Sequence, residues 1–137
     1  MTITLRKMRM SDADFMLELK NYSETRQYAI LSNKEVKKED HMKWLPKNIK
    51  YFHVIEGLDE KGKYKVGAIR IENNEVSIWV SRDYRGKQIA QRILHQISDI
   101  GMTAKIVAQN IPSMRTFIGA GFKPVEFVNN KYYIFKR

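Results

Sequence analysis

Residues 81–90 have the composition of an anion-binding loop. They read Ser-Arg-Asp-Tyr-Arg-Gly-Lys-Gln-Ile-Ala and join an alternating apolar stretch to one with helical periodicity. A helix that begins here presents backbone N–H groups without intrahelical partners, and its dipole favours negative charge. Gly86 permits a positive φ, and Ala90 leaves room for a phosphate beside the first turn. A basic loop with a turn glycine is also a common structural feature without a ligand, so the loop alone leaves both interpretations open.

The overall charge is compatible with an anionic partner. The 137 residues contain 25 Lys and Arg against 15 Asp and Glu, a formal net charge of +10. Such a surface can bind nucleic acid, an anionic membrane or a small polyanion, or simply keep the protein in solution. The basic residues are spread along the chain without an aromatic RNA-binding motif or zinc-finger spacing, which argues against nucleic acid.

Several other chemistries are not supported by the composition. The chain has no cysteine, which excludes disulfides, thiolate zinc sites and a cysteine nucleophile, and fits a reducing cytoplasm. His41, His53 and His95 lack the spacing of metal ligands, so we expect no metal. No apolar run approaches the roughly 18 residues of a membrane span, and the alternating start is unlike a signal peptide. We therefore expect a cytoplasmic protein without a membrane partner.

The hydrophobic pattern predicts a single mixed α/β domain over residues 1–137 with a largely antiparallel sheet. The expected order is β-α-α-β-β-β-α-β-α-β-β. Pro46 is expected to end the second helix. The expected strands cover residues 2–8, 51–56, 64–71, 75–81, 103–109, 122–128 and 131–136.

Side-chain alternation assigns faces to the elements around the loop. In strand 75–81, Val76, Ile78 and Val80 face one way, and Glu75, Ser77 and Trp79 face the other. A long amphipathic helix then follows, with Gly101 as its stop. Its expected buried stripe is Ile89, Ile93, Ile97 and Ile100. The inward residues expected for the last helix are Met114, Phe117 and Ile118.

Two segments resemble the GNAT N-acetyltransferase superfamily. That family's acetyl-CoA signature is Arg or Gln, two residues, Gly, one residue, then Gly or Ala. Residues 85–90 match at Arg85 and Ala90, but Gln88 stands in place of the central glycine. Residues 110–122 match a second family segment, in which Asn is followed by an aromatic residue and then Gly-Phe. The expected element order is also that of the family.

The resemblance implies the GNAT fold, a mixed sheet of six to seven strands flanked by about four helices. It also implies that acetyl-CoA binds where the fourth and fifth strands splay apart. The end of the fourth strand would pair with the pantetheine arm, the loop amides would hold the pyrophosphate, and the last helix would approach the thiol. The implied cofactor-binding residues are Trp79, Val80, Ser81, Arg85, Gly86, Lys87, Gln88, Ile89, Ala90, Asn110, Ser113 and Phe117.

The family transfers the acetyl group directly to an amine, which agrees with the absence of cysteine. The amine must lose a proton, and Glu75 on the fourth strand is the candidate base. An exposed strand-edge glutamate is the equally weighted alternative. The family's tyrosine acid is replaced by Phe117, so another tyrosine or solvent would protonate the thiolate. The conceivable tyrosines are Tyr28, Tyr132 and Tyr133.

The acceptor is expected to contact the first two helices and the loop between them. Candidate substrate-binding residues are Arg26, Tyr28 and His41, although His41 and Trp44 also fit a buried helix face. This segment is similar to acetyltransferases of 4-amino sugars on nucleotide carriers. The expected partners are acetyl-CoA and a small amine, with a homodimer conceivable. The alternatives are a CoA-binding GNAT-fold protein without catalysis and a basic nucleic-acid-binding module.

Overall fold

The computed structural model describes residues 1–30, 33–97 and 101–137. Their order confirms the expected one, with the short helix α2 as an addition. The strands are β1 (Thr2–Lys7), β2 (Phe52–Asp59), β3 (Gly62–Glu72), β4 (Glu75–Val80), β5 (Thr103–Val107), β6 (Lys123–Val128) and β7 (Tyr132–Lys136). The helices are α1 (Ala13–Asn21), α2 (Ser23–Gln27), α3 (Lys38–Asn48), α4 (Ile89–Gln96) and α5 (Ile111–Gly119). Short 3₁₀ turns cover Met10–Asp12, Ile49–Tyr51 and Arg82–Tyr84.

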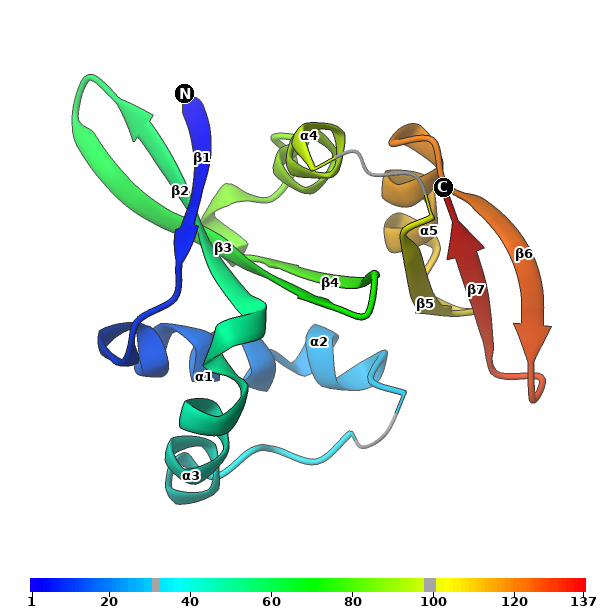
Figure 1. The fold of residues 1–137 in the computed structure, drawn as a ribbon, viewed down its shortest axis with the longest axis horizontal. Helices are drawn as coiled ribbons and strands as arrows, with labels where there is room; N and C mark the ends of the chain where they lie inside the picture. Colours follow the sequence, from blue (N-terminus) through cyan, green and yellow to red (C-terminus); the bar gives the residue numbers. More distant parts are fainter. Residues whose placement is uncertain (31–32, 98–100) are drawn as a thin grey trace.

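The seven strands form one mixed sheet in the order β1-β2-β3-β4-β5-β7-β6. Neighbouring strands are antiparallel except β4 and β5, which run parallel. Their described residues share one register pair, Glu75 with Thr103, next to a 2.8 Å hydrogen bond from the amide of Thr103 to the carbonyl of Asn74. Beyond this pair the two strands move apart (Figure 1). The mostly antiparallel sheet predicted from the sequence is therefore confirmed, and the splay between β4 and β5 is present.

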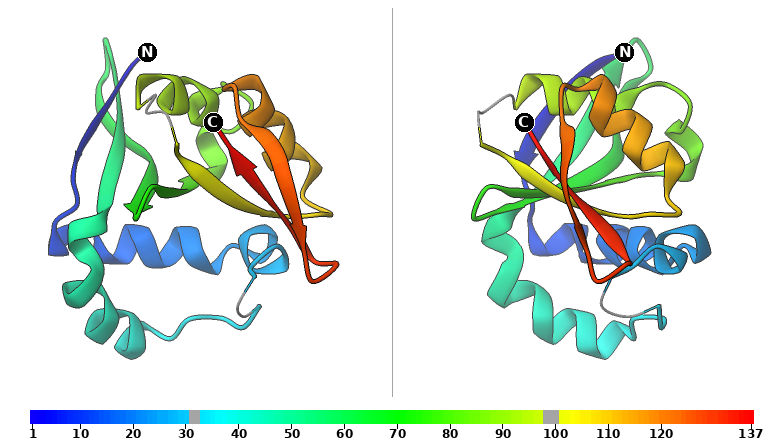
Figure 2. Two further views of the ribbon diagram at one scale, coloured as in Figure 1. Left: turned by 45° about the vertical axis from the view of Figure 1, so that its right-hand side comes forward. Right: turned by 90° about the vertical axis from the view of Figure 1, so that its right-hand side faces the viewer.

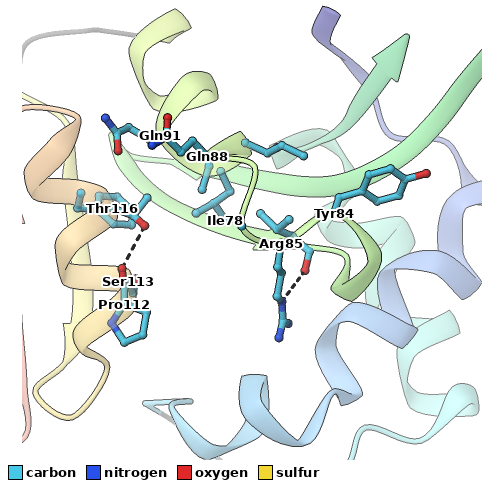
Figure 3. A pocket seen from close by; sticks show the side chains of 13 residues that line it. Ile78, Tyr84, Arg85, Gln88, Gln91, Pro112, Ser113 and Thr116 are labelled. Atoms are coloured by element: carbon cyan, nitrogen blue, oxygen red, sulfur yellow. Dashed lines mark hydrogen bonds between the residues drawn. The ribbon is translucent and has the colours of Figure 1, made fainter. Parts of the chain in front are cut away.

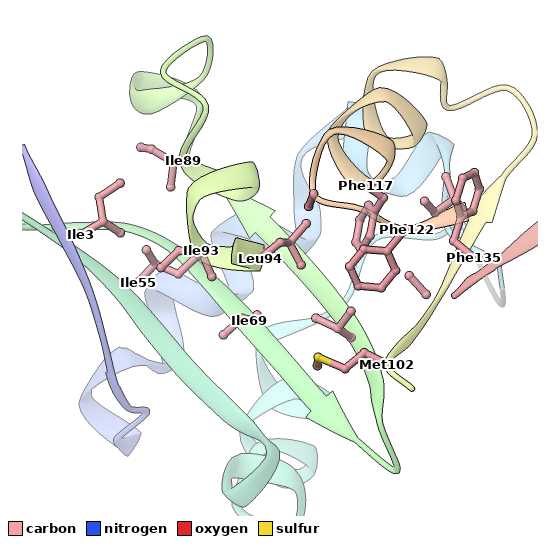
Figure 4. Packing of buried hydrophobic residues seen from close by; sticks show 14 of the residues in the cluster. Ile3, Ile55, Ile69, Ile89, Ile93, Leu94, Met102, Phe117, Phe122 and Phe135 are labelled. Atoms are coloured by element: carbon pink, nitrogen blue, oxygen red, sulfur yellow. The ribbon is translucent and has the colours of Figure 1, made fainter. Parts of the chain in front are cut away.

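Helices cover both faces of the sheet (Figures 1 and 2). Helices α4 and α5 lie on one side, which we call the α4–α5 face, and α1 to α3 lie on the other, the α1–α3 face. On the α4–α5 face, Ile93, Leu94 and Phe122 are buried in one apolar cluster (Figure 4). A second cluster on the α1–α3 face contains Leu45 and Phe52. Burying each such side chain contributes about 1.5–3 kcal/mol.

Strand β4 contributes to both clusters, as its alternation predicts. Val76 is buried on the α4–α5 face, and Ile78 and Val80 pack against the same cluster. Trp79 points to the opposite face, where its ring stacks on Phe52 at 6.0 Å between centroids. The predicted division of the strand into two faces is confirmed.

Three local predictions differ from the structure. Helix α3 continues through Pro46, although Pro46 was expected to end it. The missing N–H of Pro46 costs one hydrogen bond in the last turn, and the burial of the neighbouring Leu45 offsets this cost. Ile118 was expected inward but is 54% exposed, since the inward face of α5 is set by Phe117 and not by the residue next to it. Helix α4 spans eight residues and is shorter than expected. Ile100 lies outside the described residues.

Candidate functional site

A cavity of about 430 Å³ lies between β4, α4 and α5, where β4 and β5 have separated (Figure 3). Its walls come from one stretch that runs from β4 through the loop into α4, and from the more distant α5. Of the predicted cofactor-binding residues, those lining it are Val80, Arg85, Gly86, Gln88, Ile89, Ala90, Ser113 and Phe117. The remaining lining residues were not predicted as site residues: Ile78, Tyr84, Gln91, Pro112 and Thr116. The cavity thus joins the two segments that carry the motif.

One end of the cavity is the N-terminus of α4. The amide of Arg92 donates to the carbonyl of Gln88 at 3.0 Å, which is the first bond of the helical ladder. The N–H groups of Ile89, Ala90 and Gln91 therefore have no partner within the helix, and all three residues line the cavity. These amides and the positive end of the helix dipole favour an anionic group.

Gln88 holds this helix start in a backbone conformation that favours glycine. Its φ is 58° and its ψ is 27°, in the left-handed region, at the position where the motif has glycine. Such a conformation costs a residue with a side chain about 1–2 kcal/mol. Gly86 also has a positive φ, of 79°. The loop therefore keeps the turn of the motif, and Gln88 retains its amide at a cost in strain.

The free edge of β4 is formed by different residues from those predicted. The amide of Ser81 donates to the carbonyl of Val66 at 2.9 Å, so it is turned toward β3. The carbonyl of Trp79 also faces β3, because a Cβ on Gly67 would lie 2.3 Å from it. Backbone groups alternate along a strand, so those of Ile78 and Val80 face the gap. Of the three predicted partners only Val80 is so placed, and the strand's alternation could have indicated Ile78.

The α5 wall of the cavity contains no proton donor at the position of the family's tyrosine. The ring of Phe117 is buried and packs edge-on against Phe122, with centroids 5.0 Å apart. Asn110 caps α5, its side-chain oxygen accepting the amide of Ser113 at 3.3 Å.

Lys87 is absent from the cavity lining, and its Nζ lies 5.6 Å from the ring centroid of Tyr84.

Glu75 lies at the paired end of β4 and β5, away from the cavity lining. Its Oε1 is 3.1 Å from Nζ of Lys105. Val80 is five positions further along β4, which corresponds to about 17 Å along a strand. Its side chain shares the α1–α3 face with Trp79, so a base at this position would act from that face. The role of Glu75 as a base stays a prediction.

The candidate tyrosines are dispersed. Tyr133 packs between Phe127 and Phe135, with ring centroids at 4.5 and 6.3 Å. Tyr132 lies on β7 opposite Val107, at the end of β5 that has moved away from β4. Tyr28 follows the last residue of α2. No described geometry singles out one of them as the acid.

His41 occupies a core position in α3. It is 1% exposed, its Nε2 is 2.9 Å from the carbonyl oxygen of Ala13, and its ring stacks on Trp44. Burial lowers the pKa of His41. Arg26, on α2, donates from Nε to the carbonyl of Asn21 at 3.3 Å. The structure thus does not gather the three predicted substrate residues, and it favours the core interpretation of His41.

Asn21 closes the segment between α1 and α3 through two reciprocal hydrogen bonds. Its Nδ2 donates to the carbonyl of Val36 at 2.9 Å, and its Oδ1 accepts the amide of Val36 at 2.8 Å. The side chain therefore pairs with the backbone as a strand would. This contact joins residues fifteen positions apart, and no local pattern indicates it.

Two acidic side chains on the α1–α3 face are paired with cations, and one lysine there lies on an aromatic ring. Glu72 pairs with Arg70, and Glu75 pairs with Lys105. Lys20 lies with Nζ 3.3 Å from the ring centroid of Trp44. Burial and the nearby charge of Arg70 lower the pKa of Lys20 to about 8. An ammonium held in this way is stabilised by an aromatic face and not by a carboxylate.

Residues 1–30, 33–97 and 101–137 contain neither a metal-binding cluster nor a membrane-spanning helix. No cluster of three or more His, Cys, Asp or Glu side chains there could hold a metal ion. None of the helices described has the length and apolar character needed to cross a membrane.

Comparison with solved structures establishes the fold. A domain from Methanocaldococcus jannaschii superposes with a TM-score of 0.85 at 18% identity, over 99% of this chain and 97% of that one. A GNAT-family acetyltransferase from Bacillus anthracis gives 0.77 at 16% identity, over 99% and 92%. Spermidine N-acetyltransferase from Vibrio cholerae, solved with CoA and spermine, gives 0.76 at 18%, over 98% and 92%. The chain has the GNAT fold. No protein-family model matches the sequence, and no curated protein matches it.

Proposed function

We propose that the chain is an acetyl-CoA-dependent N-acetyltransferase that transfers the acetyl group directly to a primary amine of a small molecule. One observation carries the proposal: the unpartnered amides at the start of α4 open into a cavity at the point where β4 and β5 separate. The pyrophosphate of CoA would bind the amides of Ile89 to Gln91. The pantetheine arm would run along the edge formed by Ile78 and Val80.

The reaction needs no covalent enzyme intermediate. The amine nitrogen attacks the thioester carbon, the C–N bond forms, and the C–S bond breaks. The amine loses one proton to a base, for which Glu75 is the candidate, directly or through water. The departing thiolate takes a proton from solvent or a tyrosine, since Phe117 cannot donate one. Much of the rate would come from placing the amine against the thioester.

For the acceptor we propose an amine that carries negative charge, such as a nucleotide-linked amino sugar. Lys20, whose ammonium lies on the ring of Trp44, supports this choice. The Vibrio cholerae protein was solved with spermine, a polycation. Here Glu72 and Glu75, which could meet a polycation, are already paired with cations.

Acetyl-CoA binding and thiol release test the proposal. Calorimetry should show acetyl-CoA binding, and no binding at several hundred micromolar would refute the proposed function. Thiol release is then measured with 4-amino nucleotide sugars, spermidine and peptide N-termini. If acetyl-CoA binds but no amine causes thiol release, the alternative of a CoA-binding protein without catalysis is favoured. Phe117 and Gln88, which depart from the family's motifs, are the residues that support this alternative.

The role of Glu75 is tested with Glu75→Gln against Glu72→Gln. The two glutamates are register partners on β4 and β3, and each is paired with a cation, so the substitutions are matched. Glu75→Gln should lower turnover at neutral pH at least about a hundredfold, the lower end of the range for general base catalysis, while CoA affinity is unchanged. Equal turnover in the two variants would remove Glu75 from the mechanism.

A further inference from the structure

Two arginines beside the cavity converge on one carboxylate. Arg82 donates from Nε to Oε1 of Glu24 at 2.7 Å and from Nη2 to Oε2 at 2.8 Å. Arg85 also donates to Oε1 of Glu24, from Nη1 at 2.6 Å. Hydrogen bonding by Arg82, assisted by Arg85, holds the pKa of Glu24 well below its usual range. Two guanidiniums thus share a single negative charge, which leaves one positive charge unmatched.

A tyrosine ring arranges the two guanidiniums independently of Glu24. The guanidinium carbon of Arg82 lies 4.0 Å from the ring centroid of Tyr22, and that of Arg85 lies 5.3 Å from it. The buried Tyr22 also accepts a 3.5 Å hydrogen bond from the backbone amide of Arg82 at its hydroxyl. Stacking of this kind orients the planar forks of the arginines toward an anion.

Arg85 stands at the edge of the cavity, and Arg82 is joined to it through the carboxylate of Glu24. Arg85 lines the cavity and directly precedes Gly86, and its Nε is 3.4 Å from the carbonyl of Val80. Figure 3 shows the side chain of Arg85 turned away from α4 and toward α2. The Arg82, Arg85 and Glu24 side chains are 52%, 42% and 33% exposed. Exposed ion pairs of this kind contribute about 0–1 kcal/mol, so another anion can replace the carboxylate at small cost.

We propose that Arg82, Arg85 and Tyr22 form a second phosphate-binding site at the edge of the cavity, which Glu24 occupies until a phosphate of CoA displaces it. The inference rests on the proposed function, since CoA supplies the phosphate. A phosphate has up to two negative charges and three acceptor oxygens, so it matches two guanidiniums better than one carboxylate does. Glu24 is then an internal competitor that weakens cofactor binding.

The test compares Glu24→Gln with Glu18→Gln. Glu18 is an exposed glutamate on α1 whose Oε1 lies 3.5 Å from the hydroxyl of Tyr22, and its loss changes the net charge equally. Calorimetry with CoA should give about fivefold tighter binding for Glu24→Gln and less than about twofold for Glu18→Gln. The affinity of Glu24→Gln should also fall more steeply with salt, because more cations meet the phosphate. Adding Arg85→Gln to Glu24→Gln should remove the gain.

Unchanged or weaker binding in Glu24→Gln overturns the inference, as does an equal gain in Glu18→Gln. A second arm uses inorganic pyrophosphate, measured by the shift in melting temperature of each variant. Tighter pyrophosphate binding in Glu24→Gln without any CoA binding would refute the proposed function but leave the anion site in place. CoA binding with no difference between the variants in either arm would refute the site and leave the proposed function in place.

Discussion

The two faces of the sheet present their polar groups in different ways. On the α4–α5 face the cavity presents the backbone amides at the start of α4 and the free edge of β4, held by buried apolar side chains such as Leu94 and Phe117. On the α1–α3 face the polar groups are charged side chains in pairs, and Lys20 lies on an aromatic ring. A site built from backbone tolerates changes of residue type, as Gln88 illustrates. A site built from side chains changes its ligand with each substitution.

The strongest test of this contrast places a charge among the backbone amides. Ala90→Glu puts a carboxylate where the pyrophosphate would bind, and like charges at such a distance cost several kcal/mol. We expect CoA affinity to fall at least about a hundredfold. Ala90→Gln has a similar size without the charge and should lose far less. Similar losses in both, measured by calorimetry, would mean that sterics and not charge governs this end of the cavity.

Core truncations on the two faces should separate stability from binding. Leu94→Ala and Leu45→Ala each remove a fully buried leucine, one from each cluster. Both should lose about 2–5 kcal/mol of unfolding free energy in urea. Only Leu94→Ala disturbs α4, so only this variant should also weaken CoA binding. Equal effects on CoA affinity would show that the two faces are not independent.

Lys20 gives the α1–α3 face a pH dependence. Its pKa is lowered from 10.5 to about 8 by burial and by Arg70. Below pH 8 the ammonium is charged in both states, and its burial costs stability. Between pH 8 and 10.5 the folded chain has lost this proton and the unfolded chain retains it, so unfolding free energy rises with pH.

Lys20→Met should lack this rise. After allowance for solvent screening, we expect the difference between the wild type and Lys20→Met to change by about 1–2 kcal/mol across the window. Urea titrations at pH 7.5, 9 and 10.5 measure it, and subtraction removes the other titrating groups. A constant difference at all three pH values would contradict the lowered pKa.

The smallest effect is expected at Gln88. Gln88→Gly relieves a positive φ but gains unfolded-state entropy, so stability should rise by at most about 1 kcal/mol. CoA affinity should stay within about twofold, because the amide remains in place. A large gain in affinity would mean that the side chain of Gln88 obstructs the cavity, which would weaken the contrast between the two faces.

The sequence was most informative where structure depends on local pattern. The alternation of Val76 and Trp79 gave the two faces of β4, and the loop with its following helix gave one end of the cavity. Predictions from local sequence were wrong where packing or pairing with other parts of the fold determines the conformation. Pro46 is retained within a helix whose Leu45 is buried, and Ser81 pairs with Val66 across the sheet.

The contacts that were missed all join distant residues. Glu24 meets Arg82 from fifty-eight positions away, and Asn21 meets Val36 from fifteen. One sequence has no periodicity that encodes such pairs. The position of Glu75 illustrates the same limit, since its place on β4 was predicted but its pairing with Lys105 on β5 was not. Motifs identify the ligand end of the site more readily than they identify the acceptor end.

The clamp between Asn21 and Val36 has a consequence for how the protein can change. Its two hydrogen bonds join Asn21 at the end of α1 to Val36 shortly before α3, and so hold the two ends of residues 22–35 together. Lengthening a closed loop costs little entropy, about 0.6 kcal/mol for each doubling. The segment between the clamped ends can therefore be exchanged as a cassette in which Tyr22 and Glu24 are kept as partners of the arginines, which offers a practical route to engineer new acceptors on an unchanged donor site.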